Sequence, residues 1–221
     1  TLATVGWLAM LAGDPVLSEE TLSGSDDMWR ELDDEAQLSR SLSMHGMTTY
    51  NLNDFDRAEA MFEESSDLAR QTGLEWISEA WCVYGLAHIA LARGDMVTTD
   101  RLLRATLEYS KSRGLTWGIG HAQLSLGVLA FMMGDIGQAV ARMSESLLIR
   151  EQLQDARGIC DCLGMMAVFA SVTGDHRFAS VLLGAAEVRR EATGQIAVPW
   201  MQPMLAEATA NAERALGEDL A

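Results

Sequence analysis

Apolar positions along this chain recur with a helical period, and short polar turns interrupt them at nearly constant intervals. Each turn is Gly or Asn followed by Asp, and the five turns are Gly13-Asp14, Asn53-Asp54, Gly94-Asp95, Gly134-Asp135 and Gly174-Asp175. Their intervals are equal except that the one between Asn53 and Gly94 is longer by a single position. Because Gly suits the left-handed position that ends a helix and Asp suits the cap that begins one, each turn predicts a helix on either side. A fixed period in this range is typical of stacked helical repeats.

Two further positions repeat around each turn. A small residue lies seven positions before it, and a large apolar residue lies nine positions after it. The small residues are Gly6, Gly46, Ala87, Gly127 and Ala167, and the large ones are Leu22, Phe62, Leu103, Met143 and Leu183. We expect the small residues to let two helices approach closely and the large ones to fill the space between successive pairs.

These periods predict an all-α protein, a right-handed superhelical solenoid of about five helix pairs followed by a C-terminal capping helix. The expected repeats span about residues 1–35, 36–74, 75–115, 116–155 and 156–194, and the capping helix spans about 203–217. The prolines agree with this division, because Pro15 directly follows a turn while Pro199 and Pro203 lie beyond the last repeat. No boundary is evident between repeats, so we expect a single domain over residues 1–221.

Composition narrows the range of partners. The formal net charge is −16, and Lys and Arg do not cluster, so neither nucleic acid nor an anionic membrane surface is an expected direct partner. No apolar run approaches the roughly 20 residues of a membrane-spanning helix. The three cysteines indicate a reducing, cytoplasmic compartment rather than a disulfide framework. The chain begins with Thr1 rather than Met, and we expect it to be part of a longer protein.

The sequence carries no motif of catalysis, cofactor binding or metal binding. It has no His-Glu-x-x-His, no Gly-x-Ser-x-Gly and no paired Cys-x-x-Cys, so we expect no catalytic residue, cofactor or metal, and no enzyme. Cys160 and Cys162 are two positions apart and would point to different sides of a helix, which favours packing over chelation. The acidic runs at residues 26–27 and 33–35 are interpreted as solvated helix ends.

The order of small residue, Gly-Asp, Ala and large apolar residue resembles the tetratricopeptide pattern. Ala58, Ala139 and Ala179 supply the Ala, five positions after their turns. The repeats here are near 40 rather than about 34 residues long, and the usual closing proline is absent. Repeats of this longer kind are similar to the helical region of large bacterial LuxR-type and related STAND ATPase transcriptional regulators. The stretches that carry this similarity are residues 134–150 and 179–194.

The resemblance implies a cytoplasmic bacterial protein in which this region senses a signal or docks a partner. An ATPase module and a DNA-binding module would belong to the same parent chain. The 221 residues contain no Gly-x-x-x-x-Gly-Lys-Ser/Thr phosphate loop, so the ATPase work would lie elsewhere. Two functions remain open. The chain is a protein- or ligand-recognition module, or it is a structural spacer or self-association element, such as a homo-oligomer contact, without a ligand of its own.

In a right-handed stack, the first helix of each pair would line the concave face. The same five positions before each turn are expected to point into this face, and before Asn53 they are Arg40, Ser43, Met47, Tyr50 and Asn51. The candidate partner-binding residues are Arg40, Met47, Tyr50, Asn51, Trp81, Tyr84, His88, His121 and Phe131. Because Trp, Tyr and Arg are the usual anchors of recognition, this face is a candidate groove for a protein, a peptide or a small-molecule ligand. In the alternative interpretation, Trp81 and Tyr84 only pack between neighbouring first helices.

Overall fold

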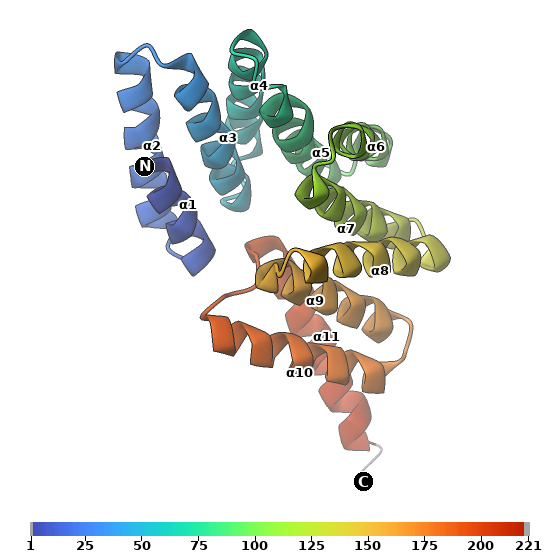
Figure 1. Cartoon of the computed structure of the whole chain (residues 1–221). Coiled ribbons are helices and arrows are strands. Elements are labelled where there is room, and N and C mark those ends of the chain that lie inside the picture. Colours follow the sequence, from blue (N-terminus) through green and yellow to red (C-terminus); the bar gives the residue numbers. More distant parts are fainter. Residues whose placement is uncertain (1, 219–221) are drawn as a thin grey trace. The chain divides into compact units, whose positions relative to one another are not determined.

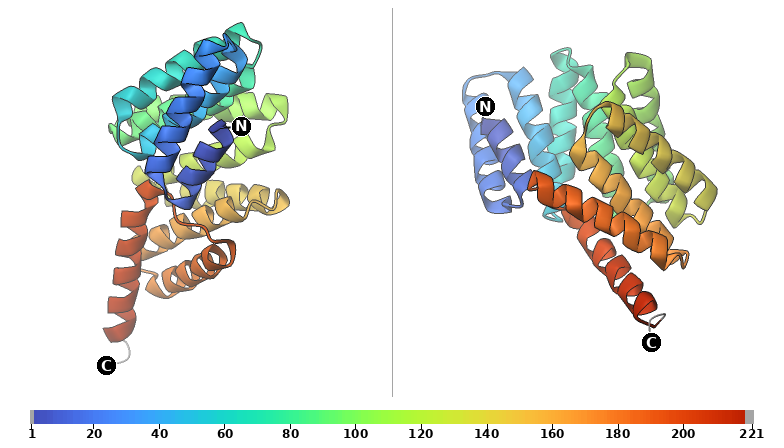
Figure 2. Two further views of the ribbon diagram at one scale, coloured as in Figure 1. Left: turned by 90° about the vertical axis from the view of Figure 1, so that its left-hand side faces the viewer. Right: turned by 60° about the horizontal axis from the view of Figure 1, so that its bottom comes forward.

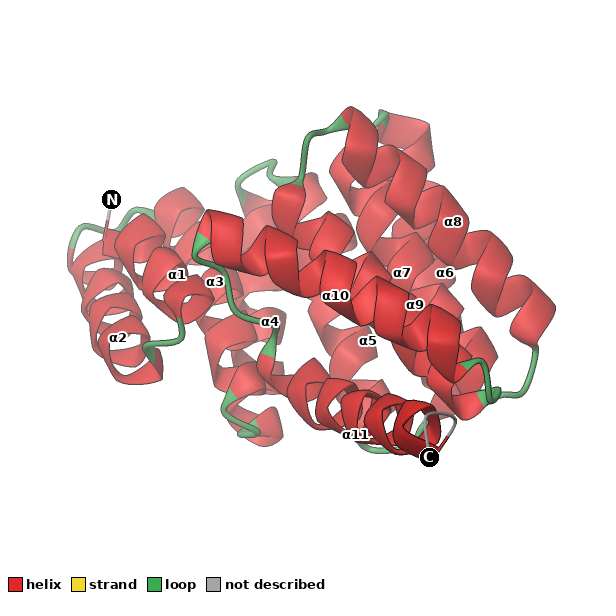
Figure 3. Cartoon of the chain, turned by 90° about the horizontal axis from the view of Figure 1, so that it is seen from below, coloured by secondary structure: helices red, strands yellow, loops and turns green. Residues whose placement is uncertain are grey.

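The computed structural model describes residues 2–218, which form helices joined by short turns (Figure 1, Figure 3). Within this range no residue belongs to a β-strand, and the predicted all-α class is confirmed. The elements are α1 (Leu2–Ala12), α2 (Pro15–Glu31), α3 (Glu35–Asn51), α4 (Phe55–Gln71), the π-helical segment η1 (Ile77–Cys82), α5 (Val83–Ala92), α6 (Met96–Arg113), α7 (Thr116–Met132), α8 (Ile136–Gln152), α9 (Ala156–Val172), α10 (His176–Thr193), the 3₁₀ turn η2 (Pro199–Met201) and α11 (Gln202–Glu218).

Contacts divide the chain into two compact units, Thr1–Ala122 and Gln123–Ala221. The boundary falls inside α7, so the first unit holds α1 to α6 with the start of α7, and the second holds the rest of α7 with α8 to α11. Each unit by itself is a set of packed helices that fits an α solenoid. The single repeat domain expected from the sequence remains a prediction.

The five predicted turns each join two helices. Their first residues have positive φ angles, from 63° at Asn53 to 87° at Gly174, the region in which glycine is favoured. The Asp that follows accepts a hydrogen bond from the backbone N–H three positions later, as in the 2.9 Å bond from Thr98 to Asp95. The other four turns show the same cap. The helix end and helix start predicted at each turn are therefore confirmed.

The repeated small residues lie where two helices approach closely, as expected. All five are buried. A Cβ added at Gly6 would lie 2.6 Å from Leu22 Cγ, and one added at Gly127 would lie 3.3 Å from the Ala139 carbonyl oxygen. Leu22 and its equivalents in the next three pairs are at most 1% exposed, whereas Leu183 in the last pair is only half-buried.

One helix pair contains an extra residue, and a local change of helix type absorbs it. The helical stretch before Gly94 runs from Glu75 to Ala92 and is longer by a single position than α3, α7 and α9, which have 17 residues each. Within it, Ile77–Cys82 is π-helical. A π-turn lengthens the hydrogen-bonded ring by one residue and so accommodates an insertion without ending the helix. The longer interval between Asn53 and Gly94 in the sequence marks this insertion, and Trp81 lies within the π-helical segment.

In the second unit, α11 packs against α9 and α10 (Figure 1, Figure 2). Met201 and Leu205 join Val168 of α9 in one hydrophobic core cluster, and Asn211 Nδ2 donates to Ser171 Oγ at 3.4 Å. A helix was predicted at about residues 203–217, and α11 confirms it. This helix covers the side of α9 on which Val168 and Ser171 lie.

Candidate binding surface

Aromatic rings from successive first helices meet in the first unit. Trp81 packs against Trp7 of α1 and Trp117 of α7, with ring centroids 5.7 and 5.5 Å apart. Tyr84 of α5 continues the contact to His88 at 4.5 Å and to His121 at 5.5 Å. We name this set the aromatic band, which comprises Trp7, Tyr50, Trp76, Trp81, Tyr84, His88, Trp117 and His121.

The band extends at both ends beyond Trp81 and Tyr84. Tyr50 of α3 lies 5.8 Å from His88, and Trp76 lies 6.2 Å from Trp117 between ring centroids. Arg40 lies over Trp76, with Cζ 5.9 Å from the ring centroid, which is within cation–π range. Six of the candidates named from the sequence thus lie in one region of the first unit. They are Tyr50, Trp81, Tyr84, His88 and His121 within the band and Arg40 at its edge.

Burial separates the packed members of the band from the accessible ones. Tyr50, Tyr84 and His88 are at most 9% exposed, so they contribute chiefly to packing. Trp81, Trp117 and His121 are half-buried, and Trp76 is 38% exposed. Trp81 Nε1 donates to the Ser43 carbonyl oxygen at 3.2 Å, which satisfies its polar group and holds the ring in place. The packing interpretation therefore describes Tyr84, whereas the tryptophans retain exposed surface.

Burial also sets the charge of the band. It lowers the pKa of His88 to about 4, because the charged imidazolium would lose its hydration, and this ring is neutral near pH 7. Burial raises the pKa of Tyr50 to about 12, with a further contribution from Tyr84. These two groups are therefore uncharged near pH 7, and Arg40 brings positive charge to the edge of the band.

The remaining three candidates lie outside the ring contacts of the band. Met47 and Asn51 are half-buried on α3, and Asn51 Nδ2 donates to the Met47 carbonyl oxygen at 2.9 Å. Phe131 belongs to the second unit, where it stacks on Phe169 with centroids 4.1 Å apart and packs against the hydrophobic core. Phe131 is thus a packing residue of the second unit, where it contacts Phe169 and the hydrophobic core.

Three tryptophans of the band were not among the candidates, although the sequence carries a signal for each. Trp7 lies six positions before Gly13, a spacing that marks the same face in the later repeats. Trp76 and Trp117 both end a Gly-Leu-x-Trp segment at the break between two repeats. A rule applied to the first repeat and to these breaks would have included them.

A buried polar cluster joins α2, α3 and α4 of the first unit. His45, which is 1% exposed, contacts Asp26 Oδ2 through Nδ1 at 2.5 Å and Glu19 Oε2 through Nε2 at 3.0 Å. Arg57 pairs with Glu19 in turn. Asp26 is 3% exposed, so its interpretation as part of a solvated helix end is wrong. His45 supplies the polar partner that makes its burial possible.

The cysteine thiols point to different helices. Cys160 Sγ donates to the Ala186 carbonyl oxygen of α10 at 3.7 Å, and Cys162 Sγ donates to Ser146 Oγ of α8 at 3.4 Å. Burial raises the pKa of both thiols. Within residues 2–218, no three His, Cys, Asp or Glu side chains gather in a way that could hold a metal ion. No helix in that range is both long and apolar enough to cross a membrane.

Comparison with known proteins supports the fold. No protein-family model matches the chain, and no curated protein matches it. Among solved structures, the chain is similar to BtubC (BKLC) from P. vanneervenii, with 18% sequence identity and a TM-score of 0.62. The match covers 89% of this chain and 87% of that chain. At this identity the likeness shows a common helical fold and nothing about function.

Proposed function

We propose that this chain is the recognition module of a cytoplasmic bacterial transcriptional regulator of the LuxR type, and that the aromatic band binds a protein or peptide segment or a small-molecule ligand. In this proposal the helix pairs form a right-handed superhelical solenoid of about five tetratricopeptide-like repeats. The support for these repeats is the recurrence of the Gly/Asn-Asp turn with its left-handed residue and its Asp cap. The ATPase and DNA-binding modules would lie elsewhere in the parent protein.

The observation that carries the proposal is the group of partly exposed tryptophans in the first unit. Trp76 and Trp81 both contact Trp117, and all three rings keep part of their surface exposed. Tryptophan and arginine are prominent among the residues whose truncation most weakens protein interfaces. Trp81 and Trp117 both contact His121, which packs on the buried Tyr84, and Trp81 is also held by its bond to Ser43. Rings held in this way lose little conformational entropy when a partner binds.

A structural spacer or self-association element is the second candidate function. The contacts between Trp7, Trp81 and Trp117 also join successive first helices, which is what a spacer requires. The two functions differ in the consequence of removing one ring. A spacer loses stability, whereas a recognition module loses affinity while its fold remains.

The test compares two variants after a thermal-shift screen of peptides and small molecules has identified a ligand. Trp81→Ala removes the central ring of the band, and the expected loss of affinity is about 2 kcal/mol or more, measured by calorimetry. Glu108→Ala changes an exposed residue of α6 and is expected to leave affinity unchanged. Circular dichroism of both variants checks that helical content is preserved.

The screen also separates the alternatives. If no ligand is found, and light scattering shows an oligomer that Trp81→Ala dissociates, the self-association function replaces the recognition function. Equal ligand affinity of the wild-type chain and Trp81→Ala would remove the aromatic band from the binding surface.

A further inference from the structure

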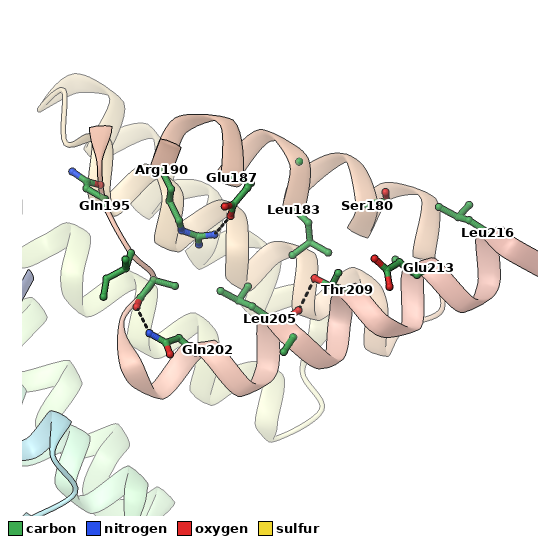
Figure 4. A pocket seen from close by; sticks show the side chains of 15 residues that line it. Ser180, Leu183, Glu187, Arg190, Gln195, Gln202, Leu205, Thr209, Glu213 and Leu216 are labelled. Atoms are coloured by element: carbon green, nitrogen blue, oxygen red, sulfur yellow. Dashed lines mark hydrogen bonds and ion pairs between the residues drawn. The ribbon is translucent and has the colours of Figure 1, made fainter. Parts of the chain in front are cut away.

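A pocket of about 630 Å³ lies in the second unit between α10 and α11, beside the segment at residues 195–197 (Figure 4). Leu183 and Leu205 face each other across it, and Arg190 and Gln195 line one end. A volume of this size is typical of sites for small organic ligands. Leu183 is only half-buried because the pocket lies against it, whereas its equivalents in the earlier pairs are fully covered.

The guanidinium of Arg190, at one end of this pocket, has few close hydrogen-bond acceptors. Arg190 is 7% exposed, yet its Nε has no hydrogen-bond partner. Its Nη2 donates to the Cys160 carbonyl oxygen at 3.5 Å, and its Nη1 lies 3.6 Å from Glu187, whose side chain is 63% exposed. Beside it, Oε1 of Gln195 is buried and also has no partner. A buried guanidinium with such long contacts is costly unless a further acceptor completes it.

The preceding repeat shows which groups pair with the equivalent arginine. Arg150 lies one repeat before Arg190 in the sequence and is likewise buried. Its Nη1 pairs with Asp155 Oδ2 at 2.6 Å, and its Nε donates to Ser146 Oγ at 3.2 Å. The pair with Asp155 is short and places one carboxylate oxygen directly on the guanidinium.

The last repeat has neither of these partners. At the position equivalent to Asp155 it has Gln195, and at the position equivalent to Ser146 it has Ala186. The change from Ser to Ala explains why Nε of Arg190 is unpartnered, and the change from Asp to Gln removes the carboxylate. Arg190 therefore occupies the position of Arg150 without the close carboxylate, its ion pair with Glu187 is 3.6 Å long, and a pocket adjoins the guanidinium.

We propose that this pocket binds a small amphipathic monocarboxylate, whose carboxylate takes the place at Arg190 that Asp155 takes at Arg150. The apolar body of the ligand lies between Leu183 and Leu205. The pocket residues of α10 run from Ser180 to Arg190, a length of about 15 Å at the rise of an α-helix. Glu213 lies toward the opposite end from Arg190 and disfavours a second carboxylate there (Figure 4). The site does not depend on the function proposed for the aromatic band.

Titration calorimetry of the 221-residue chain with decanoate tests the proposal, with decan-1-ol and decanedioate as matched probes. Decanoate is expected to bind roughly tenfold or more tightly than decan-1-ol, since a hydrogen bond to a charged group is worth about 1.5–3 kcal/mol. Decanedioate is expected to bind more weakly than decanoate because of Glu213. Equal affinity for decanoate and decan-1-ol, or no binding of decanoate, would overturn the proposal.

Two variants assign the binding to Arg190. Arg190→Gln is expected to lower decanoate affinity roughly tenfold or more, while Arg189→Gln, an exposed neighbour outside the pocket, is expected to leave it unchanged. Gln195→Asp recreates the pair seen at Arg150. It is expected to raise the melting temperature of the free chain and to lower decanoate affinity, and it keeps the test valid if Arg190→Gln fails to fold. If Gln195→Asp and a folded Arg190→Gln both bind decanoate with wild-type affinity, decanoate does not bind at Arg190 and the proposal is wrong.

A peptide experiment distinguishes the free acid from a carboxylate carried by a partner helix. A peptide with the sequence of residues 154–172 carries Asp155 at its helix start and imitates the partner of Arg150. Decanoate binding that exceeds peptide binding supports the small-molecule site. Arg190-dependent binding of the peptide without binding of decanoate would overturn it.

Discussion

The ring of Phe62 fills the space beside Gly85, so that a Cβ added at Gly85 would overlap Phe62 Cζ. Phe62 is 0% exposed and also contacts the site of a Cβ at Gly46, at 3.0 Å. The ring is therefore held between two glycines of two different first helices. Gly85 lies in α5, shortly after the π-helical segment Ile77–Cys82.

Gly85→Ala is expected to destabilise the chain by about 1–3 kcal/mol, because overpacking outweighs the better helix propensity of alanine. The matched control is Gly24→Ala in α2, where a Cβ would meet nothing within 4 Å. The control is expected to gain roughly 0.5–1 kcal/mol. Urea unfolding followed by circular dichroism measures both. A gain in stability for both variants would show that the ring of Phe62 can move aside.

Local signals in the sequence were enough to place the helix ends and helix starts at the five Gly/Asn-Asp turns. Asp95 caps the helix that follows it and Gly94 ends the one before it, so these two residues alone predict the turn between the two helices. The binding surface was less accessible to such reasoning. The contact between Trp7 and Trp81 joins side chains that lie far apart in the sequence, and it depends on how successive helices pack. Periodicity assigned Trp81 to a face, but it could not tell which rings beside it are buried.

The buried pair of Asp26 and His45 is a second case in which the sequence pattern did not predict which residues are buried. Asp26 and Asp27 are adjacent acidic residues, and composition treats them alike. The two residues differ only in the side of α2 on which they lie. Asp26 faces His45 on α3, while Asp27 is exposed. Hydrophobic periodicity does not predict a buried carboxylate, because it counts every Asp as a surface residue.

Asp26→Ala is therefore expected to destabilise the chain by about 1–3 kcal/mol, since it leaves a polar atom of His45 buried without its partner. Asp27→Ala, at the next position and exposed, is expected to change stability by no more than about 0.5 kcal/mol. Urea unfolding at pH 7 compares the two. Equal effects would mean that the contact between Asp26 and His45 contributes nothing to the folded state.

His88 gives the chain a stability that depends on pH. Its pKa is about 4 in the folded chain, against 6.5 for an ordinary histidine, because burial disfavours the charged ring. Between these two values the unfolded chain binds a proton that the folded chain does not, so the free energy of unfolding rises with pH across this window and falls as the pH drops from about 6.5 to about 4. A difference of this size corresponds to about 3 kcal/mol in all. Other ionisable groups contribute to the same pH dependence, and a variant is needed to separate the contribution of His88.

His88→Gln removes the titrating ring and keeps a neutral polar side chain at the site. We expect the stability of the wild-type chain relative to this variant to decrease by about 3 kcal/mol between pH 7 and pH 4, with most of the decrease beginning below about pH 6.5. Chemical unfolding at half-unit pH steps measures the difference, in which the shared carboxylates cancel. A difference that is constant with pH would mean that His88 takes up its proton as readily in the folded chain as in the unfolded one, and the ring would then lie in water rather than beneath Tyr50 and Tyr84.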